Sequence, residues 1–531
     1  MKAKAVLKQA LAAATVLAVS TTALAQEDYD PNAILNFATN ADPTLNPWTP
    51  GAVIESNLIN TILFDQLTRY DKEDLSPSPG LAVGWEAAED SLSWTFQLRE
   101  GVLWSDGEPF TAEDVAFTFN DAVLNPDLGA NNSSVFAPVD NVEVIDDHTV
   151  RFNLNEPFSA LPIYLAYYAG ILPEHVLGEA ENPLNVASFN KSSPVVTGPY
   201  KVREFVPGAY IHLEPNENYW GETPKVGGIV FRIIADVNTQ VAQLMSGELD
   251  MATITNPALL AGLERNQNLS VIRQSQNLYY FTVLNHENEK FQDVRVRQAL
   301  TYALDRPAMI SAILEGYGTV ANGPIAPIQQ AFYREDLADL YPYDPERALE
   351  LLAEAGWERG DDGLLRKDGQ VFEIDMPTGQ YGYLVPATLL AQQYWEDLGI
   401  RVNVEVMEWN AYIQQVIIER DFEASLAWWS TPPTPDIAPY HATPSAGGGN
   451  NIPAYSSEEL DALLDEGRAA RTLEEQQQVY GRVQELVAED LPYGYLWYPD
   501  MITVRNNRLQ GIADINQATA FQYAAEWFVV R

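Results

Sequence analysis

The sequence predicts a large α/β protein, because stretches with the two-residue period of a strand alternate with stretches that have the period of an amphipathic helix. In residues 93–98, apolar and polar side chains alternate, as in a half-buried strand. Residues 291–306 carry a continuous apolar stripe, and Pro307 is expected to end that helix. No internal repeat and no long linker divides the chain, so its structural units are expected to be interleaved.

The stretch after this first strand carries turn and helix signals in quick succession. Gly101 breaks the strand, and Gly107 with Pro109 supplies the residues that a tight surface turn needs. Thr111 is a natural N-cap, and Asp114 three residues later can complete a capping box. The pattern therefore predicts strand, turn, strand, turn and helix start between residues 92 and 115.

Further elements follow from the same signals along the chain. Asp344 with Pro345 is expected to open a helix that ends at Gly356. Helices are also expected over 55–67, 388–398 and 411–419 and after the capping boxes at Ser456 and Thr472; strands are expected over 34–38, 404–409 and 424–428, with a hairpin over 142–154.

The order of residues in 94–115, WTFQLREGVLWSDGEPFTAEDV, closely resembles the signature of the family 5 extracytoplasmic solute-binding proteins. This group contains the oligopeptide-, dipeptide- and nickel-binding proteins that serve ABC importers. Residues 196–202, 216–220 and 293–306 are similar to further landmarks of the family, so the resemblance covers nearly the whole chain after residue 25. It implies a periplasmic binding protein fold that is type II-like and of the large cluster C type. That fold has two lobes, an extra subdomain in lobe I and a ligand cleft between the lobes.

The resemblance also implies how the chain is divided between the lobes. Residues 26–70, 195–278 and 500–531 are expected to form the core of lobe I, 71–194 its inserted subdomain, and 279–499 lobe II. The two segments that cross between the lobes are expected near 275–283 and 497–504.

Residues 1–25 have the layout of a secretory signal peptide. Three lysines precede a short apolar core, and Ala23-Leu24-Ala25 precedes Gln26, so cleavage is expected after Ala25. The chain contains no cysteine, and a lipid anchor of this family would need one. We therefore expect a free protein in a Gram-negative periplasm, exported by a cleaved signal peptide and not inserted in the membrane.

The chain is strongly acidic, with 31 basic and 74 acidic residues and a net charge of −43. Removal of the three signal-peptide lysines leaves 28 basic residues and a net charge of −46. This charge repels nucleic acid and anionic lipid, so we expect neither as a partner. It is consistent with adaptation to a saline medium, where salt screens the self-repulsion.

The sequence lacks the constellations that an enzyme or metal site would need. Its five histidines are scattered, with no HExxH pattern, and there is no GxSxG elbow and no cysteine nucleophile. We therefore expect no catalytic activity, no cofactor and no metal site. A periplasmic hydrolase and a chaperone are the remaining alternatives from other classes, to be tested by turnover assays and by dye binding to an exposed apolar patch.

Aromatic residues mark the most promising ligand-binding stretch, residues 404–440. By resemblance, Trp409 corresponds to a pocket tryptophan of the oligopeptide-binding proteins, and Trp428 to the tryptophan that opens their ligand loop. Trp429 and Ser430 continue that loop, which prolines hold stiff. Core packing is the alternative role for both matched tryptophans.

The loop departs from the peptide binders at Thr431. By resemblance this position holds an aspartate that pairs with the α-ammonium group of a peptide ligand, and the next acid in this chain is Asp436. Losing the aspartate weakens the case for a peptide and leaves an oligosaccharide as the alternative ligand, because tryptophan faces stack on uncharged sugars.

Further cleft residues follow from topology and from the resemblance. Asn40, Ala41 and Asp42 correspond to a main-chain clamp after the first strand, Phe136 to a cleft tyrosine, and Tyr381 lies in a glycine-flanked loop before a helix. The sequence therefore predicts a monomeric substrate-binding protein of an ABC transporter. It would capture a peptide, or a solute of peptide size, between its lobes and deliver it to the permease.

Overall fold

The structure is a computed structural model, and it describes residues 29–50, 54–167, 169–338, 340–443, 450–513 and 517–531. The predicted signal peptide, residues 1–25, lies outside the described residues. None of the helices in the described ranges combines the length and apolar composition that a membrane span requires.

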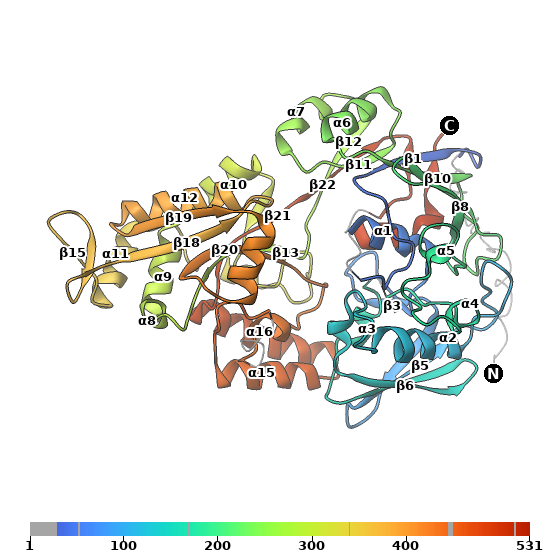
Figure 1. Ribbon diagram of the computed structural model, residues 1–531, viewed down its shortest axis with the longest axis horizontal. Helices are drawn as coiled ribbons and strands as arrows, with labels where there is room; N and C mark the ends of the chain where they lie inside the picture. The colour runs from blue at the N-terminus through green and yellow to red at the C-terminus, as the bar shows by residue number, and fades with distance from the viewer. Residues whose placement is uncertain (1–28, 51–53, 168, 339, 444–449, 514–516) are drawn as a thin grey trace, which may run out of the picture.

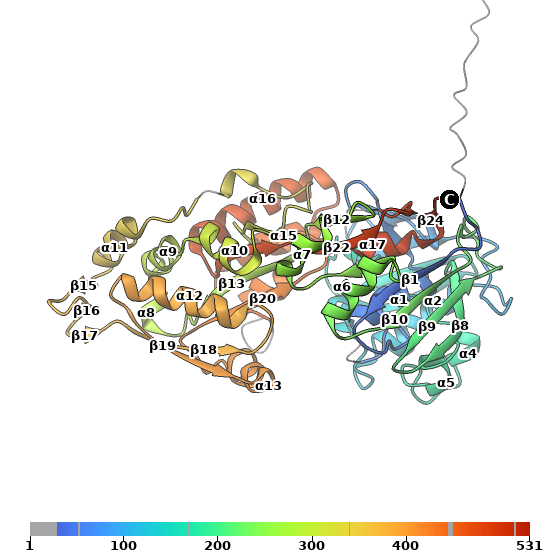
Figure 2. The same ribbon diagram turned by 90° about the horizontal axis from the view of Figure 1, so that it is seen from above.

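The protein has two lobes, each built on its own β-sheet (Figures 1 and 2). Lobe I carries a seven-stranded sheet and an additional four-stranded sheet, and lobe II carries a further four-stranded sheet. Helices cover these sheets in both lobes. The predicted class, a two-lobed α/β binding-protein fold, is confirmed.

The seven-stranded sheet of lobe I collects strands from three distant parts of the chain. β1 is parallel to β10 and β11, and β22 is inserted antiparallel between β11 and β12. The strands, in sheet order, are β12 (Leu269–Gln274), β22 (Met501–Asn506), β11 (Met251–Thr253), β1 (Ile34–Thr39), β10 (Gly228–Ile233), β9 (Tyr210–Pro215) and β8 (Tyr200–Val206). Helices α1 (Ile54–Leu63), α6 (Val237–Ser246), α7 (Leu260–Leu263) and α17 (Gln517–Gln522) also belong to this lobe.

The four-stranded sheet of lobe I lies in the segment predicted as an inserted subdomain. Its strands, in sheet order, are β4 (Ala82–Ala87), β5 (Ser93–Leu98), β7 (Thr149–Leu154) and β6 (Val139–Asp146). The helix α2 (Ala112–Phe117) follows the predicted turn. Glu113 N donates to Thr111 Oγ1 at 3.3 Å and Thr111 N donates to Asp114 Oδ2 at 3.0 Å, so the predicted capping box is confirmed.

Lobe II packs helices against both faces of its sheet. The strands, in sheet order, are β14 (Gly318–Val320), β21 (Gly494–Pro499), β13 (Leu278–Leu284) and β20 (Ala424–Ser430); β18 (Glu373–Gly379) and β19 (Arg401–Met407) form a parallel pair beside them. One buried cluster contains residues of α9 (Val294–Tyr302), α10 (Arg306–Leu314), α11 (Pro345–Glu354) and α12 (Leu384–Asp397). A second contains residues of α15 (Glu458–Ala469) and α16 (Leu473–Asp490).

Two chain segments cross between the lobes. Residues 275–277 join β12 of lobe I to β13 of lobe II, and Asp500 joins β21 to β22 in the opposite direction. Arg273 Nε donates to Asp500 Oδ2 at 2.7 Å, and the Arg273 guanidinium lies 4.7 Å from the ring centre of Tyr317. The two crossings are therefore tied to each other by one arginine.

A third connection between the lobes is made by contacts between folded segments and not by a crossing of the chain. The C-terminal end of α15 contacts the loop after β7, where Ser159 N donates to Arg468 O at 3.0 Å and Ser159 Oγ donates to Gly467 O at 3.1 Å. Phe158 of that loop and Tyr164 of the following helix α3 (Leu161–Tyr164) belong to the same buried cluster as the apolar faces of α15 and α16. One apolar core therefore continues from the inserted subdomain into lobe II.

Several predicted helix boundaries are wrong. The helix expected over 291–306 is divided into α8 (Glu289–Gln292), α9 and α10, with Asp293 as the N-cap of α9. Pro307 does not end a helix but lies in the first turn of α10, where its missing N–H has no intrahelical partner to lose. Helix α15 begins after Ser457 and not after Ser456.

Candidate functional site

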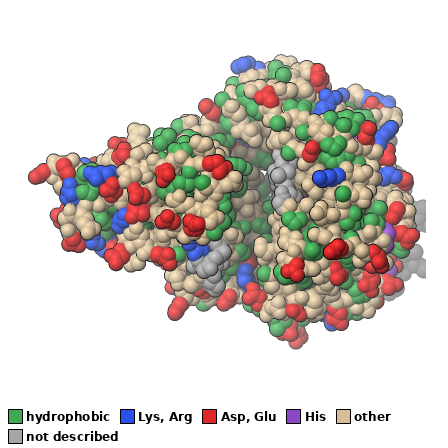
Figure 3. Space-filling view, in the orientation of Figure 1, with side chains coloured by type: hydrophobic (Ala, Val, Ile, Leu, Met, Phe, Trp, Pro, Cys, Tyr) green, Lys and Arg blue, Asp and Glu red, His purple; other side chains and the backbone are tan. Residues whose placement is uncertain are grey.

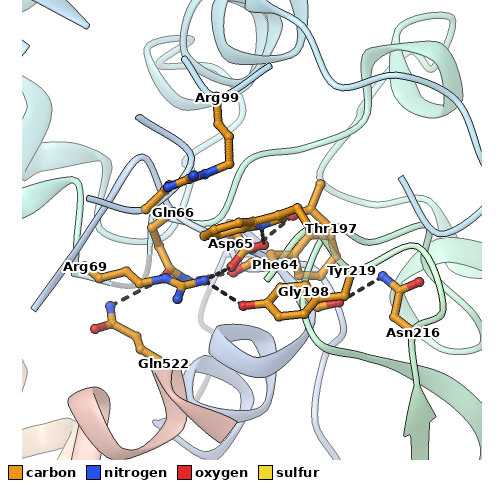
Figure 4. A network of polar contacts seen from close by, with 12 residues as sticks. Phe64, Asp65, Gln66, Arg69, Arg99, Thr197, Gly198, Asn216, Tyr219 and Gln522 are labelled. Carbon is orange, nitrogen blue, oxygen red and sulfur yellow. Dashed lines mark hydrogen bonds and ion pairs between the residues drawn. The ribbon is translucent and has the colours of Figure 1, made fainter. Parts of the chain in front are cut away.

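Three of the four stretches that carry the family resemblance, 94–115, 196–202 and 216–220, meet in one buried network of lobe I (Figure 4). Asp65, which follows α1, accepts hydrogen bonds from Arg69 Nη2 at 2.5 Å and from Trp220 Nε1 at 2.8 Å. Its backbone N–H donates to Thr197 Oγ1 at 3.1 Å. Arg99 reaches the same place from the signature stretch, and its guanidinium lies 4.1 Å from the ring centre of Trp220.

Backbone contacts join the same three stretches at close range. Ser105 N donates to Val196 O at 2.8 Å, and Asn218 Nδ2 donates to Trp104 O at 3.1 Å. Gly198 lies so close to α1 that a Cβ atom there would be 2.1 Å from the carbonyl oxygen of residue 62. These three stretches therefore hold the inserted subdomain against the main sheet.

The region suited to a ligand is the furrow between the lobes, which Figure 3 shows as a deep hollow. On the lobe II side, β18 and β19 are parallel, so their carboxyl ends meet at one edge, next to the end of β20. Ligands of α/β proteins bind in the crevice outside such strand ends. In Figure 2, the short helix α13 (Trp409–Tyr412) marks this edge, on the side that faces lobe I.

Four aromatic rings form a near-parallel stack at this edge. Tyr381 and Trp409 have ring centres 4.7 Å apart with an interplanar angle of 26°, and Tyr381 and Trp428 have centres 5.9 Å apart at 18°. Trp409 and Tyr412 continue the stack at 5.3 Å and 15°. Tyr412 is buried, and its hydroxyl donates to Leu426 O at 2.6 Å, so the inner end of the stack is fixed while Tyr381 is exposed.

Two contacts bring lobe I residues to the same border. Tyr383 OH of lobe II donates to Thr255 O of lobe I at 3.3 Å. Burial raises the pKa of Tyr167 in the inserted subdomain to about 12, while a hydrogen bond with the side chain of Ser430 lowers it. Ser430 itself is exposed. These contacts place the start of α12 and the end of β20 against lobe I.

The predicted clamp residues lie at the carboxyl end of β1. Asn40 Oδ1 accepts a hydrogen bond from Gln240 Nε2 at 2.9 Å, and Asp42 Oδ1 accepts one from Gly208 N at 2.7 Å. Asn40, Ala41 and Asp42 are exposed. Their backbone groups follow a strand end of lobe I, and the side chains of Asn40 and Asp42 form hydrogen bonds within the lobe.

Phe136 does not line the furrow. Its side chain is 1% exposed and packs edge-on against Trp48 and Phe119 in the core of the inserted subdomain. A ring without exposed surface offers nothing to a ligand, so we withdraw Phe136 from the candidate set. Phe136 was predicted from the resemblance alone, and no local pattern in the sequence indicates that its side chain is buried.

Asp436 is also removed from the candidate set, because its carboxylate is buried and paired. The residue is 3% exposed, Arg468 Nε donates to its Oδ2 at 3.0 Å, and Ala438 N donates to its Oδ1 at 3.1 Å. Arg468 Nη1 also donates to Glu156 Oε1 of the inserted subdomain at 3.1 Å. Asp436 is therefore part of the contact between the lobes and is not placed to receive a ligand amine.

Trp429 and Thr431 lie on either side of Ser430 and are half-buried. Trp429 packs against Tyr440 with ring centres 5.1 Å apart, and Thr431 N donates to Asn277 O of the first crossing segment at 2.8 Å. The loop is thus anchored at its start to the crossing, with the Thr431 side chain uncharged where the resemblance implies an aspartate.

The histidines give no sign of a metal site in the part of the chain that the structure describes. No group of three or more histidine, cysteine, aspartate or glutamate side chains is placed there to hold an ion. Burial lowers the pKa of His441 to about 3, and its Nε2 lies 2.8 Å from Tyr495 OH. His441 is therefore a neutral core residue.

Sequence reasoning missed Tyr167, Thr255 and Tyr383, which all lie at the border between the lobes. Tyr383 is two residues beyond the predicted Tyr381, and the loop before α12 could have been taken as a whole. Tyr167 and Thr255 follow no local pattern, because only the packing of the two lobes brings them to the border.

Two α/β lobes that are joined by two crossing segments and face each other across an aromatic-edged furrow define the class of two-lobed solute-binding proteins. The chain belongs to the bacterial extracellular solute-binding proteins, family 5, whose model matches residues 76–451.

Three relatives illustrate the similarity. The oligopeptide-binding protein AppA of Bacillus subtilis is 30% identical over 458 residues, which cover 85% of this chain and 84% of the relative. Its structure in complex with a nonapeptide covers 95% of this chain and 100% of its own, with a TM-score of 0.75 and 27% identity.

The heme-binding protein A of Haemophilus influenzae is 29% identical over 479 residues, 84% of each chain. The structure of NikZ from Campylobacter jejuni in complex with Ni(L-His) has a TM-score of 0.75 and 28% identity, and covers 94% of this chain and 100% of its own.

Proposed function

We propose that this protein captures peptides in the furrow between its lobes and delivers them to the permease of an ABC importer. The observation that carries the proposal is the aromatic edge of lobe II, where the rings from Tyr381 to Tyr412 stack beside α13, the helix that lies on the side of lobe I in Figure 2. Aromatic faces at a strand-end crevice bind apolar and planar groups of a solute without needing a charge on it.

Peptides are the first candidate because AppA, named as an oligopeptide-binding protein and solved with a nonapeptide, is similar to this chain over most of both lengths. Haem and a nickel–histidine complex are named for relatives of nearly the same identity, so family membership alone does not choose the ligand. The oligosaccharide alternative rests only on Thr431 and on tryptophan stacking, and the names of these relatives do not favour it.

Ligand binding is proposed to act through closure of the lobes. Residues 26–70, 195–278 and 500–531 with the subdomain 71–194 would form one body and residues 279–499 the other, moving about the crossings at 275–277 and Asp500. A ligand that touches both lobes favours the closed form by the difference between its affinities for the closed and open forms. The protein would act as a monomer without catalytic turnover.

Export is proposed to follow the signal in residues 1–25, with cleavage before Gln26 and release as a free protein into a Gram-negative periplasm. Amino-terminal sequencing of the protein recovered from a periplasmic fraction tests this. A mature chain that begins at Gln26 supports the proposal, and a chain that retains residues 1–25 contradicts it.

The ligand class is tested by a thermal-shift screen of the chain from Gln26 onward. The panel contains di- to pentapeptides, di- to tetrasaccharides, haem and nickel with histidine. A ligand present at about 100 times its Kd should stabilise the protein by roughly 2.7 kcal/mol. We expect shifts with peptides; shifts with only sugars, haem or nickel–histidine would overturn the peptide assignment.

The anchor of the peptide amine gives a sharper version of the same test. A desolvated carboxylate that pairs with the α-ammonium group contributes about 2–3 kcal/mol, but position 431 is a threonine and Asp436 is paired with Arg468. We therefore expect an acetylated peptide to bind within about threefold of its free form, because no charge-assisted bond is lost. The variant Thr431→Asp should restore a preference for the free amine, measured by calorimetry with the same two peptides.

A further inference from the structure

The position of Tyr381 within the aromatic stack differs from that of its neighbours. Its ring lies between Trp409 and Trp428, near-parallel to both, yet the residue is 50% exposed. It is carried on an exposed turn in which Gly382 has a left-handed φ of 52°. A ring on such a turn is held mainly by its two stacking partners.

The hydrogen bonds of this turn hold its backbone, and they do not involve the Tyr381 ring. Tyr381 N donates to Gly379 O at 2.9 Å and Gln380 N donates to Met407 O at 3.0 Å. Gly379 is buried and allows Trp409 and Tyr412 to pack directly on the strand, since a Cβ atom there would lie 2.9 Å from Trp409 Cε3. Among the residues that the structure describes, none forms a hydrogen bond with the Tyr381 hydroxyl.

The two sides of the Tyr381 ring are not equally tight. Its centre is 4.7 Å from that of Trp409 and 5.9 Å from that of Trp428, so the two ring centres on the Trp428 side lie farther apart. The two tryptophans are fixed by their strands: Trp428 belongs to β20, and Trp409 begins the helix that follows β19. The two indole rings therefore form the sides of a slot, and the Tyr381 ring, which is carried on an exposed turn, lies between them.

We propose that the Tyr381 ring occupies a slot between Trp409 and Trp428 that takes a planar side chain of the peptide when a peptide binds. On binding, the Tyr381 ring swings out on its turn and the ligand ring takes its place between the two indoles. Tyr381 is then a specificity-determining residue, because only a flat group can replace its stacking on both faces. This inference rests on the proposed peptide-binding function.

The test compares two side chains of similar size but different shape. Tripeptides of alanine with either phenylalanine or the non-planar cyclohexylalanine at each position are titrated by calorimetry into the whole protein from Gln26 onward. An aromatic stacking contact corresponds to about a threefold to tenfold gain in affinity. We expect this preference for phenylalanine at one position of the peptide.

Variants then assign the preference to the slot. Tyr381→Ala empties the slot and should raise the affinity for the preferred phenylalanine peptide relative to trialanine by about threefold or more. Trp409→Ala should abolish the preference for phenylalanine over cyclohexylalanine. Tyr343→Ala is the matched control, because Tyr343 is also a partly exposed lobe II tyrosine, 46% exposed, but packs edge-on against Tyr394.

The outcomes separate this inference from the proposed function. If tripeptides bind with no preference for the planar ring, or if Tyr381→Ala weakens all of them equally, the peptide function stands and the slot is overturned. If no peptide binds to the wild-type protein, the proposed function fails and the slot assignment fails with it.

Discussion

At the scale of single residues, His441 couples the stability of the protein to pH. Burial lowers its pKa from the ordinary value near 6.5 to about 3, so the unfolded chain binds a proton at pH 5 and the folded protein does not. Stability contributed by this difference is fully present above pH 6.5 and is lost as the pH falls. Between pH 7 and pH 5 the loss from one such histidine is about 2 kcal/mol.

The variant His441→Asn checks this prediction by urea unfolding at the two pH values. The loss of unfolding free energy between pH 7 and pH 5 should be smaller in the variant than in the wild type by about 2 kcal/mol. His286, whose pKa burial also lowers to about 3, remains in both proteins and cancels in the comparison. An equal loss in wild type and variant would contradict the assignment.

Gly198 is predicted to tolerate no side chain. A Cβ atom would lie 2.1 Å from the carbonyl oxygen of residue 62, and neither backbone can yield without moving α1. Gly198→Ala should therefore destabilise the protein by about 1–3 kcal/mol, the usual cost of overpacking. Gly262→Ala is the control, since an added Cβ there meets nothing within 4 Å; equal unfolding midpoints for the two variants would be inconsistent with this packing.

Residue roles were the least predictable level from the sequence. The sequence identified Tyr381, Trp409 and Trp428 as candidates, and they lie together, but their ligand contacts remain a prediction. Phe136 and Asp436 fail because burial and pairing depend on packing that no local pattern records. Gly198 was noted only as part of a family landmark, and its close approach to α1 is visible only in three dimensions.

At the scale of elements, the C-terminal end of α15 is predicted to depend on Arg468. Replacing Arg468 with methionine leaves the Asp436 carboxylate buried without its cation, which costs about 3–5 kcal/mol. Glu156→Gln removes the outer partner, whose side chain is 55% exposed, and should cost less than about 1 kcal/mol.

A double variant distinguishes a buried charge from lost packing. Arg468→Met combined with Asp436→Asn should recover much of the loss, because no buried charge remains unpaired. Chemical unfolding of the single and double variants measures the coupling between the two residues. If the double variant is as unstable as Arg468→Met alone, the ion pair is not the source of the effect.

Helix starts were predicted well where capping chemistry is local, and poorly where it is not. The capping boxes at Thr111 and Thr472 and the Asp344-Pro345 start are confirmed. The apolar stripe in 291–306 is continuous, so the pattern did not indicate the helix break at Asp293. A proline that follows one helix and a proline in the first turn of the next helix give the same sequence pattern. The role of Pro307 could therefore be assigned only from the structure.

At the scale of the whole molecule, the net charge predicts a response to salt. A mature chain with a charge of −46 repels itself, and the repulsion is screened within about 3 Å at 1 M salt. The melting temperature should therefore rise as sodium chloride is added. Potassium chloride should have the same effect, because screening depends on ionic strength; a melting temperature that stays constant or falls would exclude self-repulsion as a limit on stability.

The overall architecture was predictable because the resemblance in 94–115 extends across the chain, and a two-lobed fold follows from family membership. The resemblance could not supply the third contact between the lobes at Arg468, which depends on the particular residues of α15 and of the loop after β7. It could not choose the ligand either, since the stretches that carry it lie in the buried network of lobe I and, for 293–306, at helix α9 of lobe II.

The place of β22 has a consequence for the order of events during synthesis. Residues 501–506 fill the space between β11 and β12, and Asp30 near the start of the described chain donates its N–H to Val529 O at 2.9 Å. A growing polypeptide therefore cannot complete the main sheet before residue 506 has been made. Lobe II, one uninterrupted segment, is complete earlier, so the late-forming lobe holds the long-range pairings that make folding slow.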